Sequence, residues 1–315
     1  MMTVFPKPWG VLSVKISDSA CPHCGPKCRA PANRIRKVLR TWRDGEFFTY
    51  KCIRCGISGY SHKTIRLPDA VPVVMRPDKN RSKIASWLWR KSREFYGTEV
   101  EKYLLSRSCY LQSHNIRYLE SYKNHPSCMI VRFGTDDRPS CVHLTRLVDA
   151  KKAGTDRDKI IIGRSIEPII VCDNPERTEL VITEGIEDAA SMAIATGWTV
   201  WAAGSAVRIP ALLNDSGSFR QVYITVDDDP AGHSAFKKAL EIRPDAVSIN
   251  FSKTIEKGID ANKVLIKHGK DALLASIAWR EAQHRHEIGK IGFHQMEREL
   301  GWASQILGSV RANED

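Results

Sequence analysis

Residues 222–235 read VYITVDDDPAGHSA. The β-branched and aromatic residues of the first half are typical of a buried strand, and the second half begins a helical pattern. Three adjacent carboxylates, Asp227, Asp228 and Asp229, end the strand, although like charges repel one another and lose hydration when they are buried. The stretch therefore predicts either a solvated turn or a site in which a cation lies among these acids.

Strands and helices alternate along residues 178–275. The predicted strands are short and apolar: ELVITEG at 179–185, WTVWAAGSA at 198–206, QVYITV at 221–226 and AVSINF at 246–251. Helical patterns follow the first, third and fourth of them. This order predicts a mainly parallel sheet with helices on both faces, in which the carboxyl ends of the strands meet at one edge.

Acidic residues gather at that edge. Glu184 ends the first strand, Asp227 to Asp229 end the third, and Asp260 follows the fourth. Oxygen ligands of this kind suit Mg²⁺ or Mn²⁺, and without metal their mutual repulsion would raise pKa values. The sequence therefore predicts a divalent-cation site, against the alternative of a coincidence of strand-end acids.

Two Cys-x-x-Cys pairs, CPHCG at 21–25 and CIRCG at 52–56, mark the N-terminal segment. Each spacing lets two thiolates reach one tetrahedral ion, and each glycine allows a tight turn. Between the pairs, KVLRTWRDGEFFTYK at 37–51 predicts a hairpin that turns at Asp44-Gly45. The pattern predicts a zinc ribbon with one structural Zn²⁺ and these ligands: Cys21, Cys24, Cys52 and Cys55. Three nearby residues could replace a ligand: Cys28, His23 and His62.

The net charge of +12 is concentrated in the same segment, because residues 1–66 hold 13 Lys or Arg against 3 acidic residues. Residues 178–275 hold 13 acidic residues against 10 basic ones. This asymmetry indicates one module that meets a polyanion and one that holds cations, against the alternative of a solvated basic surface. No apolar run approaches the roughly 18 residues of a membrane span, so we expect a cytoplasmic protein with reduced cysteines and no membrane partner.

Residues 67–83 carry three prolines and predict a linker. Helical patterns at 82–95 and 98–107 follow, and residues 127–149 predict an antiparallel hairpin. The next stretch is rich in basic residues that offer a surface for phosphates: Lys151, Lys152, Lys159 and Arg164.

Three segments carry a family resemblance. TEGIEDA at 183–189 and VDDDPAGHSA at 226–235 resemble the two motifs of the Toprim domain, and GIDANKVL at 258–265 is similar to a third segment of bacterial and phage primases. A zinc ribbon, a basic mixed segment and a Toprim domain, in this order, resemble the zinc-binding DNA primases, especially the phage type. The resemblance covers most of residues 20–275 and is loose between 67 and 177.

The resemblance implies an α/β fold class: a small β zinc ribbon, then a mixed α+β primase core containing a Toprim domain with a mainly parallel sheet flanked by helices. The implied domains are a template-binding ribbon, a linker, an N-terminal subdomain of the RNA polymerase core, a Toprim catalytic domain and a helical tail, at 1–66, 67–83, 84–177, 178–275 and 276–315.

The resemblance also implies residue roles. Glu184 would assist catalysis, and Asp227 and Asp229 would bind Mg²⁺ or Mn²⁺, with two ions expected. Asp188 and Asp260 would be accessory acids. Three basic residues lie where the family places nucleotide-contacting side chains: Arg146, Lys151 and Lys152.

The activity implied by the resemblance is nucleotidyl transfer in DNA replication. The chain would synthesise short RNA primers from ribonucleoside triphosphates on single-stranded DNA, and the ribbon would assist start-site recognition. The sequence contains no Gly-x-x-x-x-Gly-Lys-Ser/Thr stretch, so the replicative helicase is expected to be a separate chain, in a bacterial host cell if the gene is phage-encoded. Two alternatives stay open: a Toprim-type metal-dependent nuclease, and a non-catalytic zinc and Toprim recombination mediator that binds DNA.

Overall fold

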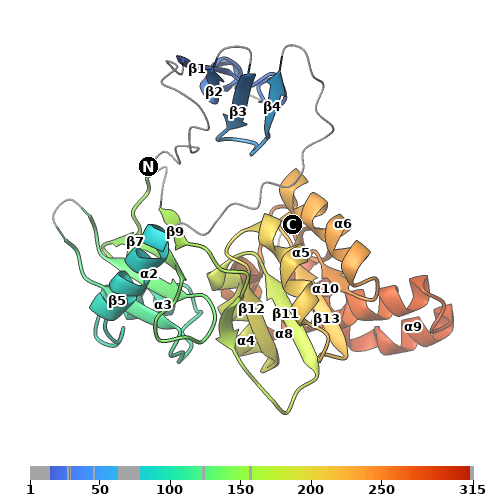
Figure 1. Cartoon of the computed structure of the whole chain (residues 1–315). Helices are drawn as coiled ribbons and strands as arrows, with labels where there is room; N and C mark the ends of the chain where they lie inside the picture. The colour runs from blue at the N-terminus through green and yellow to red at the C-terminus, as the bar shows by residue number, and fades with distance from the viewer. Residues whose placement is uncertain are drawn as a thin grey trace. The chain divides into compact units, whose positions relative to one another are not determined.

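The computed structural model describes residues 15–26, 28, 30–44, 47–62, 79–122, 125–155 and 158–312. The chain divides into two compact units, Met1–Arg76 and Pro77–Asp315 (Figure 1). The predicted linker at 67–83 lies outside the described residues up to 78, and its last residues belong to helix α2 (Lys79–Lys91). The helix includes them because no proline follows Pro77 to interrupt it.

The N-terminal unit is an antiparallel sheet in the order β1-β2-β3-β4, with a short helix α1 (Pro31–Arg34). Its strands are β1 (Lys15–Ala20), β2 (Lys37–Asp44), β3 (Phe47–Cys52) and β4 (Ser58–His62). The predicted hairpin is confirmed, because Leu39 pairs with Cys52 and Trp42 pairs with Thr49. The turn residues Gly45 and Glu46 lie outside the described residues.

The second unit begins with helices α2 and α3 (Glu99–Ser106) and a small antiparallel sheet. Its strands are β5 (Ile116–Leu119), β6 (Cys128–Arg132), β7 (Cys141–Val148), β8 (Lys151–Lys152) and β9 (Lys159–Gly163). The predicted β6–β7 hairpin is confirmed by their antiparallel pairing. Both β8 and β9 pair with β7, so Lys151, Lys152 and Lys159 belong to strands of one sheet.

A five-stranded sheet forms the centre of the second unit, in the order β10-β12-β11-β13-β14. Its strands are β10 (Ile169–Cys172), β11 (Glu179–Thr183), β12 (Thr199–Ala202), β13 (Gln221–Thr225) and β14 (Val247–Ile249). The four predicted strands are parallel, as expected, and β10 adds an antiparallel edge. The predicted α/β fold class is thus confirmed.

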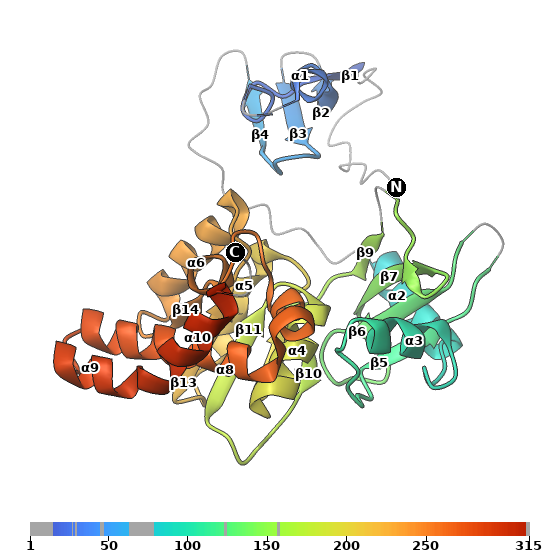
Figure 2. The same cartoon turned by 180° about the vertical axis from the view of Figure 1, so that it is seen from behind.

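Alternating side chains divide this sheet between two apolar clusters. Helices α4 (Ile186–Thr196), α8 (Ala261–Glu287) and α10 (Gly301–Ala312) lie on one side of the sheet (Figure 2). Val181 and Tyr223 belong to the apolar cluster that these helices share with that face. Leu180 and Ile182 point to the opposite face, where α5 (Ile209–Leu212) and α6 (Pro230–Ile242) lie. Because successive strand residues alternate between faces, a continuous apolar strand can be buried on both sides.

The C-terminal segment is helical and packs on the core through α10. Two short helices complete the unit, α7 (Phe251–Thr254) and α9 (Phe293–Glu299). Helix α8 crosses residue 275, where a domain boundary was expected, with non-helical backbone at Gly269. Among the described helices, none combines the length and apolar character that spanning a bilayer requires.

Candidate active site and metal centre

The four predicted zinc ligands come together at one end of the N-terminal sheet. The Sγ atoms of Cys21, Cys24, Cys52 and Cys55 all lie within 4.8 Å of one another. Sγ of Cys21 is 3.8 Å from that of Cys55, and Sγ of Cys24 is 3.8 Å from that of Cys52. A tetrahedral ion with Zn–S bonds of about 2.3 Å needs sulfur separations of about 3.8 Å, so the four thiolates fit one zinc ion.

Two glycine turns shape this centre. The N–H of Gly25 donates to the carbonyl of Cys21 at 2.8 Å, and a Cβ on Gly25 would lie 2.5 Å from that oxygen. Gly56 donates to the carbonyl of Cys52 at 3.0 Å and has a φ of 73°. Any other residue would clash at the first position or be strained at the second.

Of the substitute ligands, Cys28 has other partners. Its thiol donates to the carbonyl of Cys24 at 3.2 Å, and Nη1 of Arg54 donates to its sulfur at 2.9 Å. His23 is exposed and does not belong to the four-residue cluster, and the His62 side chain lies outside the described residues. The geometry therefore favours the four-cysteine set over one that contains Cys28 or His23.

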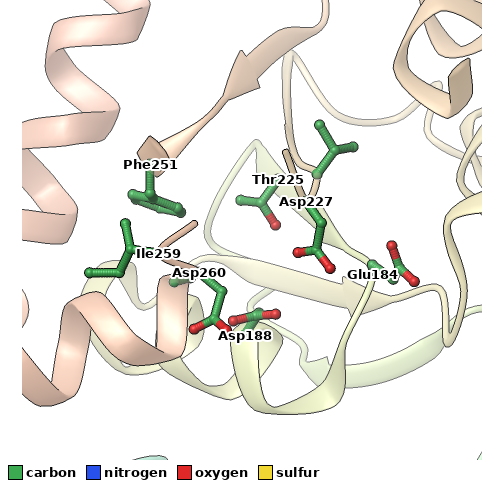
Figure 3. Close-up of a pocket in the computed structure, with 9 residues that line it drawn as sticks. Glu184, Asp188, Thr225, Asp227, Phe251, Ile259 and Asp260 are labelled. Atoms are coloured by element: carbon green, nitrogen blue, oxygen red, sulfur yellow. The ribbon is translucent and has the colours of Figure 1, made fainter. Parts of the chain in front are cut away.

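The predicted acids converge at the carboxyl edge of the parallel sheet. Glu184 directly follows β11, and Asp227 lies just beyond the neighbouring β13. Asp188 lies in the first turn of α4, and Asp260 caps the N-terminus of α8. These four line one pocket, together with Thr225, Val226, Phe251, Ile259 and Ala261 (Figure 3).

The three consecutive aspartates have three different environments. Asp227 lines the pocket, whereas Asp228 accepts a hydrogen bond from Asn250 at 3.4 Å and pairs with His233 at 3.0 Å. Asp229 caps α6, and its Oδ1 accepts the N–H of Gly232 at 2.7 Å. A carboxylate that caps a helix has a second oxygen, so Asp229 retains a lone-pair donor for a cation.

Burial and the crowding of carboxylates raise several pKa values at this site. Burial and then repulsion by Asp227 raise the pKa of Glu184. Partial burial, Asp229 and Asp260 raise the pKa of Asp227, although this residue stays exposed overall. For Asp188, burial and then Asp260 raise the pKa to about 7. A divalent cation would relieve this repulsion, so the donor set fits Mg²⁺ or Mn²⁺.

This arrangement is more open than the cysteine cluster. Among the described residues, the four cysteines are the group whose ligand atoms lie close enough together to enclose an ion. The carboxylates around the pocket leave room between them (Figure 3). Such a site suits cations that retain water or bind substrate oxygens as further ligands.

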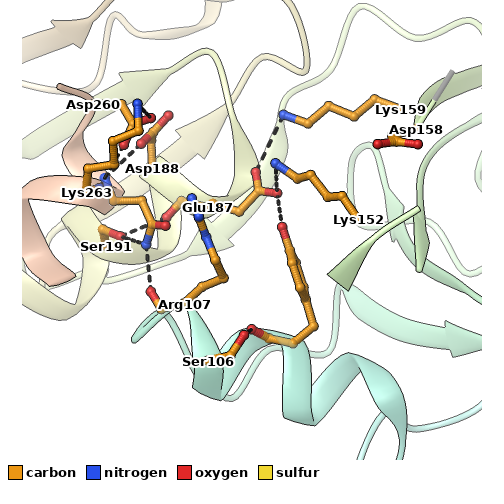
Figure 4. A network of polar contacts seen from close by, with 12 residues as sticks. Ser106, Arg107, Lys152, Asp158, Lys159, Glu187, Asp188, Ser191, Asp260 and Lys263 are labelled. Carbon is orange, nitrogen blue, oxygen red and sulfur yellow. Dashed lines mark hydrogen bonds and ion pairs between the residues drawn. The ribbon is translucent and has the colours of Figure 1, made fainter. Parts of the chain in front are cut away.

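The three basic residues predicted to contact nucleotides occupy different positions. Lys151 is exposed on β8, and Arg146 lies on β7 with its backbone bonded to Asp158 and Ala153. Lys152 extends from β8 toward α4, where its Nζ is 2.9 Å from Oε1 of Glu187 (Figure 4).

Sequence reasoning missed two residues of this region. Glu187 is a buried ion-pair partner, and Asn262 is fully buried, with its N–H donating to Asp188 at 2.9 Å and its side-chain amide donating to Ser191 at 2.9 Å. Their partners come from segments more than 25 residues away in the sequence, so no local pattern could indicate these contacts.

Comparison with known proteins agrees on the central domain. The family model of the Toprim domain matches residues 179–271. None of the curated proteins matches this chain.

Several solved structures are similar. The primase fragment of the bacteriophage T7 primase-helicase protein is 12% identical with a TM-score of 0.43, and the match covers 74% of this chain and 94% of that one. The zinc-binding and RNA polymerase domains of the Aquifex aeolicus primase are 14% identical with a TM-score of 0.43, covering 96% and 92%. The DnaG primase catalytic domain bound to ssDNA is 13% identical with a TM-score of 0.42, covering 73% and 96%. We call the carboxylates that line the pocket, Glu184, Asp188, Asp227 and Asp260, the acidic edge of the sheet. Together with the strand order and this acidic edge, the family match identifies residues 179–271 as a Toprim domain.

Proposed function

We propose that this chain is a DNA primase, which synthesises short RNA primers on single-stranded DNA by nucleotidyl transfer. The observation that carries the proposal is that carboxylates and lysines lie close to one another around the first turn of α4. Carboxylates from two parallel strand ends and two helix N-termini line a pocket, and lysines of the preceding subdomain lie beside α4. Polymerisation of nucleoside triphosphates needs oxygen ligands for cations and basic groups for phosphates.

In this proposal Asp227, Asp229 and Glu184 hold the divalent cations, with Asp188 and Asp260 as accessory acids. Two bound ions supply activation of a 3′ hydroxyl and stabilisation of the leaving pyrophosphate. The chain's own task is to position the substrates: Arg146, Lys151 and Lys152 contact nucleotide phosphates or the template. The N-terminal unit, which holds the four cysteines, contributes to recognition of the template start site, and its basic strands favour binding of a polyanion.

The proposal is tested by incubating the zinc-loaded chain with single-stranded DNA, four ribonucleotides and Mg²⁺ or Mn²⁺. Labelled oligoribonucleotides whose sequence depends on the template are the expected product. Asp227→Asn is the inactive control, and Asp228→Asn is its matched partner, because Asp228 faces His233 and Asn250 instead of the pocket.

Other products would identify the alternatives. Cleavage of the DNA that is lost in Asp227→Asn would indicate a nuclease that uses the same acids. Tight binding of single-stranded DNA without either product, at several metal concentrations, would indicate a non-catalytic mediator. If primers form, addition of a replicative helicase from the same source tests whether that separate chain is the partner, through a rise in primer yield.

A further inference from the structure

A buried carboxylate lies beside the acidic edge without belonging to it. The side chain of Glu187, on α4, is 5% exposed and does not line the pocket. Tyr103 Oη, from α3, donates to its Oε1 at 2.6 Å, and Lys159 Nζ, from β9, is 3.6 Å from its Oε2. With Lys152, two lysines of the antiparallel subdomain thus reach one carboxylate of the Toprim domain (Figure 4).

The charges of this cluster are uneven. Burial alone would raise the pKa of Glu187, but Lys159, Lys152 and the Tyr103 hydroxyl together hold it far below its usual range. Burial and Glu187 raise the pKa of Tyr103, and burial and Lys159 lower the pKa of His143, on β7, to about 4. At neutral pH the cluster therefore contains one negative and two positive groups.

Lys159 has two sets of possible anionic partners, Glu187 and the carboxylates of the acidic edge. Its side chain is 45% exposed, and it is long enough to move its ammonium group between neighbouring acids. Its charge also acts on the acidic edge, because it partly offsets the rise in the pKa values of Glu184 and Asp227 that burial and neighbouring acids cause. An ammonium group bonded to those carboxylates would occupy the oxygens that a divalent cation needs.

We propose that Glu187 is a positioning residue that keeps Lys159 off the acidic edge, so that Glu184 and Asp227 stay open to the divalent cation. The buried carboxylate is the stronger partner, because it is shielded from water and is oriented by Tyr103. Held in this way, Lys152 and Lys159 remain beside the cation site with part of their surface exposed for phosphate groups.

The inference rests on the cation site of the proposed function, and its test does not require primer synthesis. Binding of Mn²⁺ to the zinc-loaded full chain is measured by electron paramagnetic resonance, with Asp227→Asn to identify binding at the acidic edge. Glu187→Gln keeps the shape and the tyrosine hydrogen bond but removes the charge. We expect it to raise the Kd for Mn²⁺ about tenfold, because Lys159 then pairs with the catalytic acids.

The double variant distinguishes this mechanism from a simple loss of negative charge. If Lys159 is the competitor, Glu187→Gln with Lys159→Gln should bind Mn²⁺ within about twofold of Lys159→Gln alone. If Glu187 attracts the cation directly through space, the loss persists without Lys159 and the proposal is overturned. An unchanged or lower Kd in Glu187→Gln overturns it as well.

Two further variants keep the test interpretable. Glu281→Gln is the matched control, since Glu281 also accepts a tyrosine hydroxyl, from Tyr223 at 3.0 Å, and it should not change Mn²⁺ binding. If Glu187→Gln does not fold, Glu187→Asp retains the charge but shortens the reach to Lys159. It should raise the Kd about threefold, and Lys159→Gln should remove this effect; an unchanged Kd contradicts the proposal. A chain that binds Mn²⁺ as expected but makes no primers would refute only the proposed function.

Discussion

Cys52 on β3 and Ile182 on β11 are both fully buried strand residues, but their surroundings differ. The apolar cluster around Cys52 has only Cys21 and Val38 as further buried members among the described residues. Ile182 lies in a cluster that includes Leu180, Trp201, Ile209, Val222 and Ile224, and a second cluster covers the other face of the sheet. We therefore expect the N-terminal unit to depend on a bound zinc ion for its stability, whereas the Toprim domain depends on packing.

Cys52→Ser is the substitution that should separate the two units most strongly. Zinc binding contributes about 10–16 kcal/mol in small zinc domains, so the N-terminal unit should unfold and lose its zinc. The second unit should keep its cooperative melting transition, because it has extensive apolar clusters built, among the described residues, from its own side chains. Zinc content and calorimetry measure the two effects.

Cys28→Ser is the matched control for that experiment, since Cys28 bonds to Cys24 O and Arg54 outside the four-sulfur cluster. It should retain one zinc per chain. A Cys52→Ser protein in which both units unfold together would show that the second unit also needs the zinc ribbon.

Asp227→Asn tests the second unit. Unlike Cys52→Ser, it should remove activity and leave the fold intact. Primer synthesis should fall by about a thousandfold or more, a loss of roughly 4 kcal/mol in transition-state stabilisation. Thermal stability without divalent cations should stay equal or rise, because burial and then repulsion raise the pKa values of Asp227 and Glu184. Asp228→Asn should retain most activity; equal losses in both variants would remove the distinction between these neighbours.

The pH dependence of stability tests the charge of Asp188 in the second unit. Because the pKa of Asp188 is raised from 3.8 to about 7, the folded state favours the protonated form. Its stabilising contribution is complete below about pH 4 and is lost as the pH rises through 7. Without divalent cations, Asp188→Asn should therefore stabilise the chain at pH 8, by at most about 4 kcal/mol, and have little effect at pH 4.

Denaturant titrations at several pH values measure that difference for the second unit. Mn²⁺ should reduce the advantage of Asp188→Asn at pH 8, because a bound cation favours the ionised carboxylate of the unsubstituted protein. A difference that is independent of pH would show that folding does not shift the pKa of Asp188.

The smallest expected effect concerns two lysines on strands of the two units. Lys51 is exposed on β3, whereas Lys152 is 2.9 Å from the buried Glu187. If both contact the template, Lys51→Gln should lower the slope of log K against log salt for single-stranded DNA by about 0.7, and Lys152→Gln by less, because Glu187 already offsets its charge. Fluorescence titrations at several salt concentrations compare them; a larger change for Lys152 would mean that it leaves Glu187 when DNA binds.

Much of the fold followed from local patterns. The strands around Val181 and Tyr223 are continuous apolar runs between helical patterns, which specify a parallel sheet, and the edge where Glu184 and Asp227 meet follows from that topology. The antiparallel strand β10 was not predicted, because four apolar residues without alternation do not distinguish an edge strand from a loop. The helix predicted after the fourth strand runs on to Glu287 as α8, because helical periodicity resumes beyond Gly269.

The four-cysteine cluster, the acidic strand ends and the order of the two units could be predicted from the amino-acid sequence, because they follow from the order and spacing of residues along the chain. Three sets of contacts depend instead on tertiary packing: Asp228 turns to His233 and Asn250, Cys28 bonds to Arg54, and Lys152 and Lys159 pair with Glu187. Glu187 and Lys159 are 28 positions apart and carry no shared pattern. Their pairing arises because packing β9 near α4 buries a carboxylate, and a buried carboxylate requires positive partners close by.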